Sequence, residues 1–534
     1  MRAVRGAAVP AVVIAALALA GCTPAAPPYA PRVELGEAPP GDAVELAEGG
    51  LDGALDALPE VVEHVLDETG VPGAAVAVVH DGETVFADGF GVKRVGEDDP
   101  IDAETVFQVA SMSKPIGSTV VATQVTDGVV GWDTPVAPLL PGFALADPWV
   151  TEHLTVGDLY SHRSGLPMAA GDDLEDIGYD REYVIDHLRY EPLKPFRTSY
   201  GYANFGMTTG AQAVANAAGV DWETLSEQEL YEPLGMTSTS SRYDDFVARD
   251  DRADLHALVD GEFQPLYERD PDAQSPAGGV SSNAVDVAKW MAFVLAGGVA
   301  EGETLVDTPD LAAAMQPQVT SAPSAVPSMR SGSYGYGFNV GTQSSGRVTA
   351  SHSGAFVLGA GTNFQLVPSL GLGIVALTNG APVGAAEAIT TEFLDLVQYG
   401  EPSRDWVEAY GAALAHYREP AGDLVDETAP ASPAPPSAPL EAYAGTWSND
   451  YFGPAEVAVE GGSLVVRLGP DGGYELPLDT WDGDTFAFTP TGENAPDGSR
   501  SSATFVLGGG GAGAGASTLT LQFFDANGLG TWTR

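Results

Sequence analysis

Hydrophobic and polar positions in the N-terminal part of the chain follow two different patterns, one helical and one of the β type. Within residues 59–69, valines and a leucine recur at the three- and four-residue spacing that places them on one face of a helix. Residues 73–79 form a short β-branched run, and residues 84–95 alternate between apolar and polar side chains. An Asp-Gly dipeptide at positions 81–82 separates the two runs and favours a tight turn. The pattern therefore predicts a helix followed by a β-hairpin.

A long helical pattern separates this hairpin from three further β-type runs. Gly/Pro-rich loops interrupt the helical periodicity from about residue 105 to 306, and the later runs are 348–352, 359–367 and 372–378. Strands from both ends of such a segment can join one sheet, with the helices packed around it. The pattern therefore predicts an α+β domain over residues 51–400, whose sheet is assembled from both ends of the sequence.

The C-terminal part has a different, all-β pattern. Residues 401–440 contain a helical stretch and a Pro/Ala-rich linker, and residues 441–534 then repeat short alternating runs at turn spacing. These runs are typical of a small barrel or sandwich. The module contains neither histidine nor lysine, so we assign no catalytic group to it. Its glycine run at 508–513 fits the spacing G-x-G-x-x-G, but a strand pattern follows, which favours a flexible loop over a phosphate cradle.

The N-terminus carries the features of an export signal. Residues 1–21 combine basic residues, a short apolar run and small residues, and Cys22, the only cysteine of the chain, follows directly. This arrangement resembles the bacterial lipobox, which implies that Cys22 is lipidated and anchors the protein to the lipid bilayer at the outer face of the cell membrane. The alternative is an ordinary cleaved signal with a stray cysteine. The Pro-, Ala- and Glu-rich residues 22–50 are typical of a disordered tether.

Composition and charge exclude several classes of function. The hydrophobic fraction of 44% is sufficient for a folded core, and 74 acidic against 23 basic residues give a net charge of −51. Such a chain repels phosphate backbones, so we expect no nucleic-acid partner. Without a further cysteine, disulfides and thiolate sites are excluded, and the eight histidines are scattered without metal-ligand spacing. We therefore predict no metal and no cofactor. The acidity fits either a GC-rich genome or salt adaptation.

A serine and one of only four lysines form the first candidate for chemistry. Ser111 and Lys114 are three residues apart and share a helix face, and Pro115 favours the first turn of that helix. Ser111 would then lie at a helix N-terminus, where free N–H groups favour a developing negative charge. A serine hydroxyl needs a base, and lysine can act as one only when it is neutral. Taken alone, the pair also fits a polar helix start with a surface lysine.

Two further short motifs follow in order along the chain. Tyr202 and Asn204 form Y-x-N, and the run His352-Ser-Gly-Ala lies on a predicted strand. With S-x-x-K at Ser111, this order resembles the class C-like branch of the serine β-lactamase and penicillin-binding-protein superfamily. Supporting stretches lie at 154–167, 231–236 and 276–282, and the resemblance covers about residues 55–400. It implies a β-lactamase/transpeptidase-like fold with an antiparallel sheet, flanking helices and a helical subdomain, and residues 441–534 resemble the lipocalin-like barrel of some relatives.

The resemblance also implies a role for each motif residue. Ser111 would be the acylated nucleophile, Lys114 its proton acceptor, and Tyr202 the relay that protonates the leaving group. Asn204 would hydrogen-bond a substrate amide. The strand residues would line the site, with the Ala355 and Ser111 N–H groups as the oxyanion hole; these strand residues are His352, Ser353, Gly354 and Ala355.

Departures from the motif pattern refine the predicted function. Class C β-lactamases usually carry lysine at the position of His352, so the peptidase and esterase relatives are the better match. Glu232 lies in a structural segment of that branch, and Tyr200 is a weaker candidate for the relay because no asparagine follows it two residues on. We predict a membrane-anchored, extracytoplasmic serine hydrolase for small peptide, amide or ester substrates, with peptides that contain D-amino acids among the candidates. We expect the acidic segment 168–183 to control access. The alternatives are a true β-lactamase and a non-catalytic cell-surface binding protein.

Overall fold

The computed structural model describes residues 46, 49–508 and 516–534. The predicted export signal at 1–21, Cys22 and nearly all of the tether at 22–50 lie outside the described residues, as does most of the glycine run at 508–513. Within the part of the chain that is described, no helix is both long and apolar enough to cross a membrane. The same residues contain no cluster of three or more histidine, cysteine or carboxylate side chains arranged for a metal ion.

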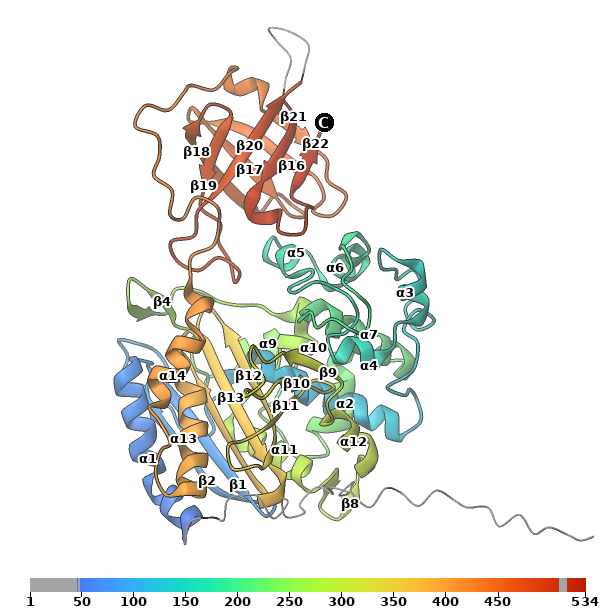
Figure 1. Ribbon diagram of the computed structural model, residues 1–534, viewed down its shortest axis with the longest axis vertical. Helices are drawn as coiled ribbons and strands as arrows, with labels where there is room; N and C mark the ends of the chain where they lie inside the picture. Colours follow the sequence, from blue (N-terminus) through green and yellow to red (C-terminus); the bar gives the residue numbers. More distant parts are fainter. Residues whose placement is uncertain (1–45, 47–48, 509–515) are drawn as a thin grey trace, which may run out of the picture. The chain divides into compact units, whose positions relative to one another are not determined.

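An eight-stranded antiparallel sheet forms the centre of the first domain (Figure 1). The strand order is β2-β1-β14-β13-β12-β11-β10-β9, so the N-terminal hairpin pairs with the last strand of the domain. The predicted α+β class and the assembly from both chain ends are confirmed. The strands are β1 (Gly73–His80), β2 (Glu83–Gly91), β9 (Val319–Ala322), β10 (Gly332–Tyr334), β11 (Asn339–Thr342), β12 (Val348–Phe356), β13 (Ala360–Val367) and β14 (Leu372–Thr378).

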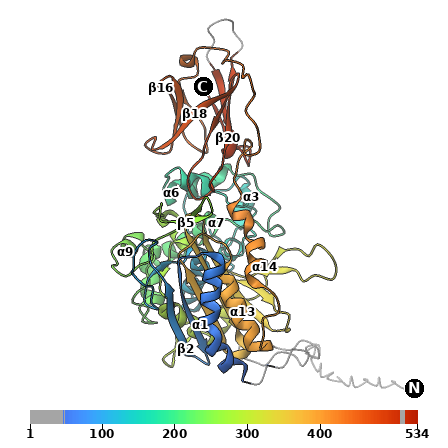
Figure 2. The same cartoon turned by 90° about the vertical axis from the view of Figure 1, so that its left-hand side faces the viewer.

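Three helices cover one face of this sheet and one helix packs on the other. On the first face lie α1 (Gly50–Thr69), α13 (Ala385–Tyr399) and α14 (Trp406–Ala413), visible together in Figure 2. The helix α11 (Ala284–Leu295) packs on the opposite face. The period-two alternation of β1 explains both layers, because Val76 faces α1 and α13 whereas Ala77 faces α11. The predicted start of the first helix at residue 59 was wrong, because Ala54 and Leu58 extend its buried face toward the N-terminus.

A helical subdomain is inserted between β2 and β9. Its central helix α2 is buried on all sides, as expected for a helix with apolar or small residues around its whole circumference. The helices are α2 (Ser113–Thr126), α3 (Pro148–His153), α4 (Val156–Tyr160), α5 (Asp172–Asp176), α6 (Arg181–His187), α7 (Asn204–Ala218), α8 (Trp222–Ser226), α9 (Tyr243–Val247), α10 (Ser275–Gly278) and α12 (Thr308–Ala314). Three two-stranded ribbons complete it: β3 (Phe107–Gln108) with β6 (Ser281–Ser282), β4 (Ala257–Val259) with β5 (Glu262–Gln264), and β7 (Val299–Ala300) with β8 (Glu303–Thr304).

A second eight-stranded sheet follows the linker. Its strands pair in sequence order, and an antiparallel bridge between Ser448 and Thr533 joins the first and last strands, so the sheet is a nearly closed barrel. Large aromatic side chains such as Trp447 and Trp532 fill its interior. The strands are β15 (Gly445–Trp447), β16 (Ala455–Glu460), β17 (Ser463–Leu468), β18 (Tyr474–Asp482), β19 (Thr485–Phe488), β20 (Ser501–Leu507), β21 (Ala516–Leu521) and β22 (Thr531–Thr533).

Candidate active site

Ser111 lies in a short, strained turn directly before α2. The 3₁₀ helix η1 (Ala110–Met112) contains it, and Ala110 adopts a φ of +48°, which is unfavourable for a residue with a Cβ atom. Two hydrogen bonds hold the turn: the Ser113 hydroxyl donates to the Ala110 carbonyl over 2.7 Å and accepts from the Val280 backbone N–H over 2.9 Å. Ser111 itself remains partly exposed, at the helix N-terminus that the sequence predicts.

Lys114 is completely buried and its amine meets three acceptors. Its Nζ lies 3.0 Å from Ser111 Oγ, 2.7 Å from Asn204 Oδ1 and 2.9 Å from the Ala277 carbonyl oxygen. Burial is the main effect on its charge and lowers the pKa of Lys114 to about 7, against a smaller opposing effect of Asp172. A neutral amine has two N–H bonds and one lone pair. If the two carbonyl-type acceptors take the N–H bonds, the lone pair is left for the Ser111 hydroxyl.

Tyr202 and Asn204 approach the same pair from the start of α7. Lys114 Nζ lies 4.6 Å from the centroid of the Tyr202 ring. Burial raises the pKa of Tyr202 well above its ordinary value, and a hydrogen bond with Ser111 only partly opposes this effect. Tyr202 is therefore a neutral phenol that can give a proton, rather than a phenolate base. Tyr200 lies against His162 and Tyr334 instead, with no hydrogen bond to Ser111 or Lys114 among the described side chains.

The strand β12 brings His352, Ser353, Gly354 and Ala355 to the serine turn. A Cβ atom on Gly354 would lie 2.2 Å from the Val109 carbonyl oxygen and 3.1 Å from the Ser111 backbone nitrogen. Only glycine therefore allows the strand to pass so close to the turn. The Ser353 hydroxyl accepts a hydrogen bond from the Asn363 amide over 3.0 Å, and His352 is 4% exposed.

Several residues near the site have no counterpart in the sequence prediction. Asp172 accepts from the Asn204 amide over 3.0 Å, and its other oxygen is buried without a hydrogen-bond partner. Burial raises the pKa of Asp172 to about 8. The segment 168–183, which contains it, stood out as acidic, but nothing in the sequence pairs Asp172 with Asn204. The Tyr334 hydroxyl bonds to His352, and the Ala277 carbonyl likewise became visible only in three dimensions.

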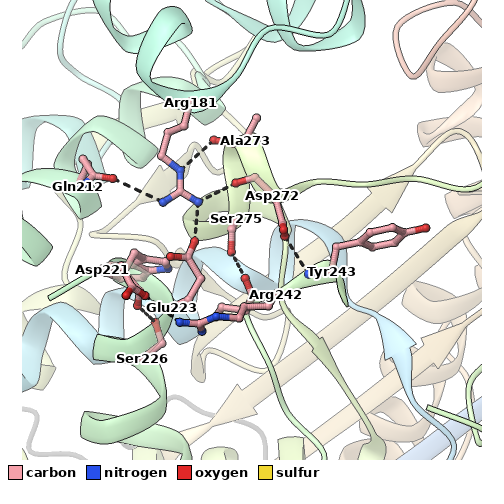
Figure 3. A network of polar contacts seen from close by, with 12 residues as sticks. Arg181, Gln212, Asp221, Glu223, Ser226, Arg242, Tyr243, Asp272, Ala273 and Ser275 are labelled. Atoms are coloured by element: carbon pink, nitrogen blue, oxygen red, sulfur yellow. Dashed lines mark hydrogen bonds and ion pairs between the residues drawn. The ribbon is translucent and has the colours of Figure 1, made fainter. Parts of the chain in front are cut away.

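A separate cluster of polar side chains lies on the helical subdomain (Figure 3). Arg181 donates to Glu223 over 2.6 Å and to the carbonyl oxygens of Asp272 and Ala273 over 2.6 and 3.2 Å. These bonds fix the turn that leads into α10, whose Ala277 carbonyl holds Lys114. A groove of about 1210 Å³ runs over this cluster, but neither Ser111 nor Lys114 lines it.

Comparisons with known proteins identify the family to which this fold and site belong. Residues 58–398 match the family model described as Beta-lactamase, and residues 429–527 match a domain of unknown function (DUF3471). The chain is 27% identical to an unguisins hydrolase of Aspergillus campestris over 74% of this chain and 75% of that protein. It is 29% identical to penicillin-binding protein 4 of Amycolatopsis lactamdurans, over 72% and 95%. The octameric penicillin-binding protein homologue from Pyrococcus abyssi has a similar fold, with a TM-score of 0.56, 20% identity and coverage of 88% and 98%.

The chain belongs to the β-lactamase family, because that family model covers more than half of its length. It is a serine hydrolase of this family. The predicted superfamily and enzyme class are thereby confirmed, together with the fold that carries the site.

Proposed function

We propose that the protein forms an acyl-enzyme on Ser111 and hydrolyses small peptide, amide or ester substrates. The arrangement around Lys114 carries this proposal. Two fixed acceptors, Asn204 Oδ1 and the Ala277 carbonyl, lie 2.7 and 2.9 Å from Nζ, and Ser111 Oγ lies at 3.0 Å. This geometry, with the pKa of Lys114 lowered to about 7, supplies a neutral base beside the nucleophile at physiological pH.

Acylation follows from this arrangement through three proton transfers. The Lys114 lone pair takes the Ser111 proton while Oγ attacks the substrate carbonyl, and the Ser111 and Ala355 N–H groups receive the developing oxyanion. Tyr202 then gives its proton to the leaving group as the bond to the carbonyl carbon breaks. The proton held by Lys114 returns to Tyr202, whose ring lies 4.6 Å away. Water hydrolyses the acyl-enzyme by the reverse proton path.

Asn204 has a broader role in this proposal than the resemblance alone implies. Its Oδ1 accepts from Lys114 and one N–H donates to Asp172. The second N–H of the amide remains for a substrate carbonyl. We therefore assign Asn204 two functions, orientation of Lys114 and contact with the acyl part of the substrate.

The relatives support peptide and amide substrates. The Aspergillus relative is named for the hydrolysis of unguisins and the Amycolatopsis relative for the binding of penicillin. Both names fit attack of a serine on an amide carbonyl.

Covalent labelling tests the proposed nucleophile. A fluorescent fluorophosphonate should label the wild-type chain, and Ser111→Ala should remove the label. Ser403→Ala is the matched control, because Ser403 is an exposed serine remote from the motifs in the sequence. Absence of label on the folded wild-type protein would contradict the proposal and favour a non-catalytic binding protein on the same scaffold.

We further propose that lipidated Cys22 tethers the protein to the outer face of the cell membrane. The sequence at residues 1–22 supports this location. In a bacterial host, the wild-type protein should sediment with membranes and incorporate labelled palmitate. Cys22→Ser should lose the palmitate and the membrane association, whereas an ordinary export signal predicts a soluble protein in both cases.

A further inference from the structure

We infer that the site prefers substrates whose leaving group carries no negative charge, such as neutral esters, amides and internal peptide bonds, over substrates with a carboxylate on the leaving group. This inference rests on the proposed function, because it names the substrate class for acyl transfer at Ser111. Its basis is the way in which Tyr334 and the backbone occupy both nitrogens of His352.

The hydrogen bonds of His352 fix its tautomer. Its Nδ1 lies 2.6 Å from the Ser353 carbonyl oxygen, which can only accept, so Nδ1 carries the proton. The Nε2 atom is then the acceptor, and the Tyr334 hydroxyl donates to it over 2.9 Å. Neither ring nitrogen has a free N–H bond, so His352 has no donor to offer a substrate carboxylate.

His352, whose two ring nitrogens are both occupied, lies close to where the leaving group departs. Tyr202 protonates the leaving group in the proposed mechanism, and the rings of Tyr202 and His352 lie 6.4 Å apart, centre to centre. The neighbouring rings form an aromatic wall on this side of the site, which consists of His162, Tyr200, Tyr202, Tyr334 and His352.

The aromatic wall is uncharged. Burial raises the pKa of Tyr200, Tyr202 and Tyr334 above the ordinary value. Burial, together with the charge of Lys114, lowers the pKa of both histidines, that of His352 to about 3.

The charges that reach the wall do not provide a counter-ion for a carboxylate. Lys114 is a cation only when it is protonated, and its charge then acts on His162 and His352. Its amine is occupied by Ser111, Asn204 and Ala277. Asp172, when it is ionised, adds negative charge near Tyr202. A carboxylate on the leaving group would therefore lose its water against this wall without gaining a cation as its partner.

Two acetate esters measure this preference with one common acyl-enzyme. The probes are 4-nitrophenyl acetate and 3-carboxy-4-nitrophenyl acetate, each normalised to its own rate of alkaline hydrolysis. Both deposit the same acetyl group, so the comparison isolates the leaving group. We expect normalised kcat/KM to be at least about tenfold higher for the neutral ester. We also expect this ratio to persist in 1 M NaCl, where the Debye length of about 3 Å removes the long-range repulsion by the acidic chain.

A variant with a new charge tests whether the effect is local. His352→Lys should place a cation on the wall and reduce the ratio at least about threefold. Val348→Lys is the matched control, because it adds the same charge at an exposed position of the same strand and should leave the ratio at the wild-type value.

Tyr334→Phe provides a second readout should the buried lysine prevent folding. Without the Tyr334 hydroxyl, Nε2 of His352 is free to take a proton. Because Lys114, His162 and Tyr202 also face this ring, we expect protonation only at acidic pH. The ester ratio of this variant should therefore fall between pH 8 and 5.5, whereas the wild-type ratio should stay constant.

The outcomes separate the two proposals. If neither ester acylates Ser111, the proposed function itself fails. If the neutral ester turns over through Ser111 but the normalised ratio is within about twofold of one, or reaches one in 1 M NaCl, only the inference about the leaving group is overturned. A ratio that Val348→Lys lowers as much as His352→Lys would also overturn it, because the effect would then be long-range.

Discussion

The reaction centre and the Arg181 cluster are both built from partly or wholly buried polar side chains, but they satisfy their charges differently. Arg181 has a carboxylate partner, Glu223, and the two side chains are 18% and 14% exposed. Lys114 is fully buried and hydrogen-bonds only to neutral oxygens. A paired cation keeps its charge and fixes a backbone turn. An unpaired buried amine loses its charge and becomes a base.

The comparison also explains why each position needs its own type of cation. The guanidinium of Arg181 donates to two carbonyl oxygens and one carboxylate. Its planar, rigid set of N–H donors matches acceptors that lie in several directions. Lysine cannot span these acceptors, and arginine cannot deprotonate at the position of Lys114. The two regions are linked, because the turn held by Arg181 leads to the Ala277 carbonyl that orients Lys114.

The largest expected effect comes from exchanging the two cations. Lys114→Arg should reduce acylation by a neutral ester by at least about 10³-fold, because guanidinium does not act as a base in proteins. Arg181→Lys, the reverse exchange, should retain acylation within about tenfold and lower the free energy of unfolding by about 1–2 kcal/mol. Stopped-flow release of 4-nitrophenol and thermal unfolding measure both effects. Equal losses of acylation in the two variants would contradict the assignment of Lys114 as the base and of Arg181 as a structural cation.

Removal of the proposed proton donor should have a smaller effect. Tyr202→Phe keeps the ring beside Lys114 but removes the hydroxyl, and we expect a loss of about 10²-fold, the lower end of the range for general-acid assistance. The loss should grow with the basicity of the leaving group, because poor leaving groups depend more on protonation. A series of substituted phenyl acetates measures this dependence, with Tyr200→Phe as the control that should follow the wild-type line. A parallel slope for Tyr202→Phe would reject Tyr202 as the donor.

The sequence predicted which residues lie together at the candidate site better than it predicted their electrostatic environment. The order of S-x-x-K, Y-x-N and H-x-G named Ser111, Lys114, Tyr202 and Asn204, because short motifs keep their spacing within a helix or turn. The partners of these residues come from distant segments: Asp172 from the start of α5 and Ala277 from α10. Side-chain burial, which lowers the pKa of Lys114, depends on the whole packed subdomain. No local pattern encodes it.

The elements of the fold, too, were predicted where a local sequence pattern determines them and missed where pairing with distant strands does. The hairpin at 81–82 and the strands β13 and β14 followed from alternation and turn chemistry. The three short strands β9, β10 and β11 were not predicted, because each has only three or four residues in a Gly- and Ser-rich region. Their place is decided by pairing at the edge of the sheet, next to β12. Tyr334 lies on one of them, which is why its contact with His352 could not be predicted.

The pH dependence of acylation should report the charge of Lys114. Because the pKa of Lys114 is lowered to about 7, acylation should rise with pH around that value as the amine loses its proton. Asp172 raises the pKa of Lys114, so Asp172→Asn should move the midpoint to lower pH, by at most about one unit. Single-turnover rates between pH 5 and 9 measure the midpoint. A shift to higher pH in Asp172→Asn would contradict the assigned electrostatic effect.

The smallest expected effect concerns stability rather than rate. Glu493, in the loop between β19 and β20, accepts hydrogen bonds from the backbone N–H groups of Val357 and Leu358 over 2.6 and 3.3 Å. These two residues directly follow β12, the strand that carries Ala355. Burial raises the pKa of Glu493 to about 8. The native state therefore holds this proton while the unfolded state releases it near pH 4.5, so its ionisation destabilises the fold increasingly between about pH 4.5 and 8.

Glu493→Gln tests this sign. The amide oxygen can still accept a hydrogen bond but does not ionise, so the variant should gain at least about 1 kcal/mol relative to wild type at pH 8 compared with pH 4.5. Chemical denaturation at the two pH values gives this difference. Val357 and Leu358 follow Ala355 closely, so the acylation rate is a useful second readout. A variant that loses stability equally at both pH values would indicate that only the hydrogen bond, and not the charge, matters.

The most direct test of the central claim is to trap the acyl-enzyme during turnover. The wild-type protein is quenched in acid while it hydrolyses 4-nitrophenyl acetate, and its peptides are analysed by mass spectrometry. We expect one acetyl group on Ser111 of the wild-type protein, and no acetylation of this peptide in Lys114→Arg. Continued turnover by Ser111→Ala, or an acetyl group that accumulates on another residue at the rate of turnover, would contradict it.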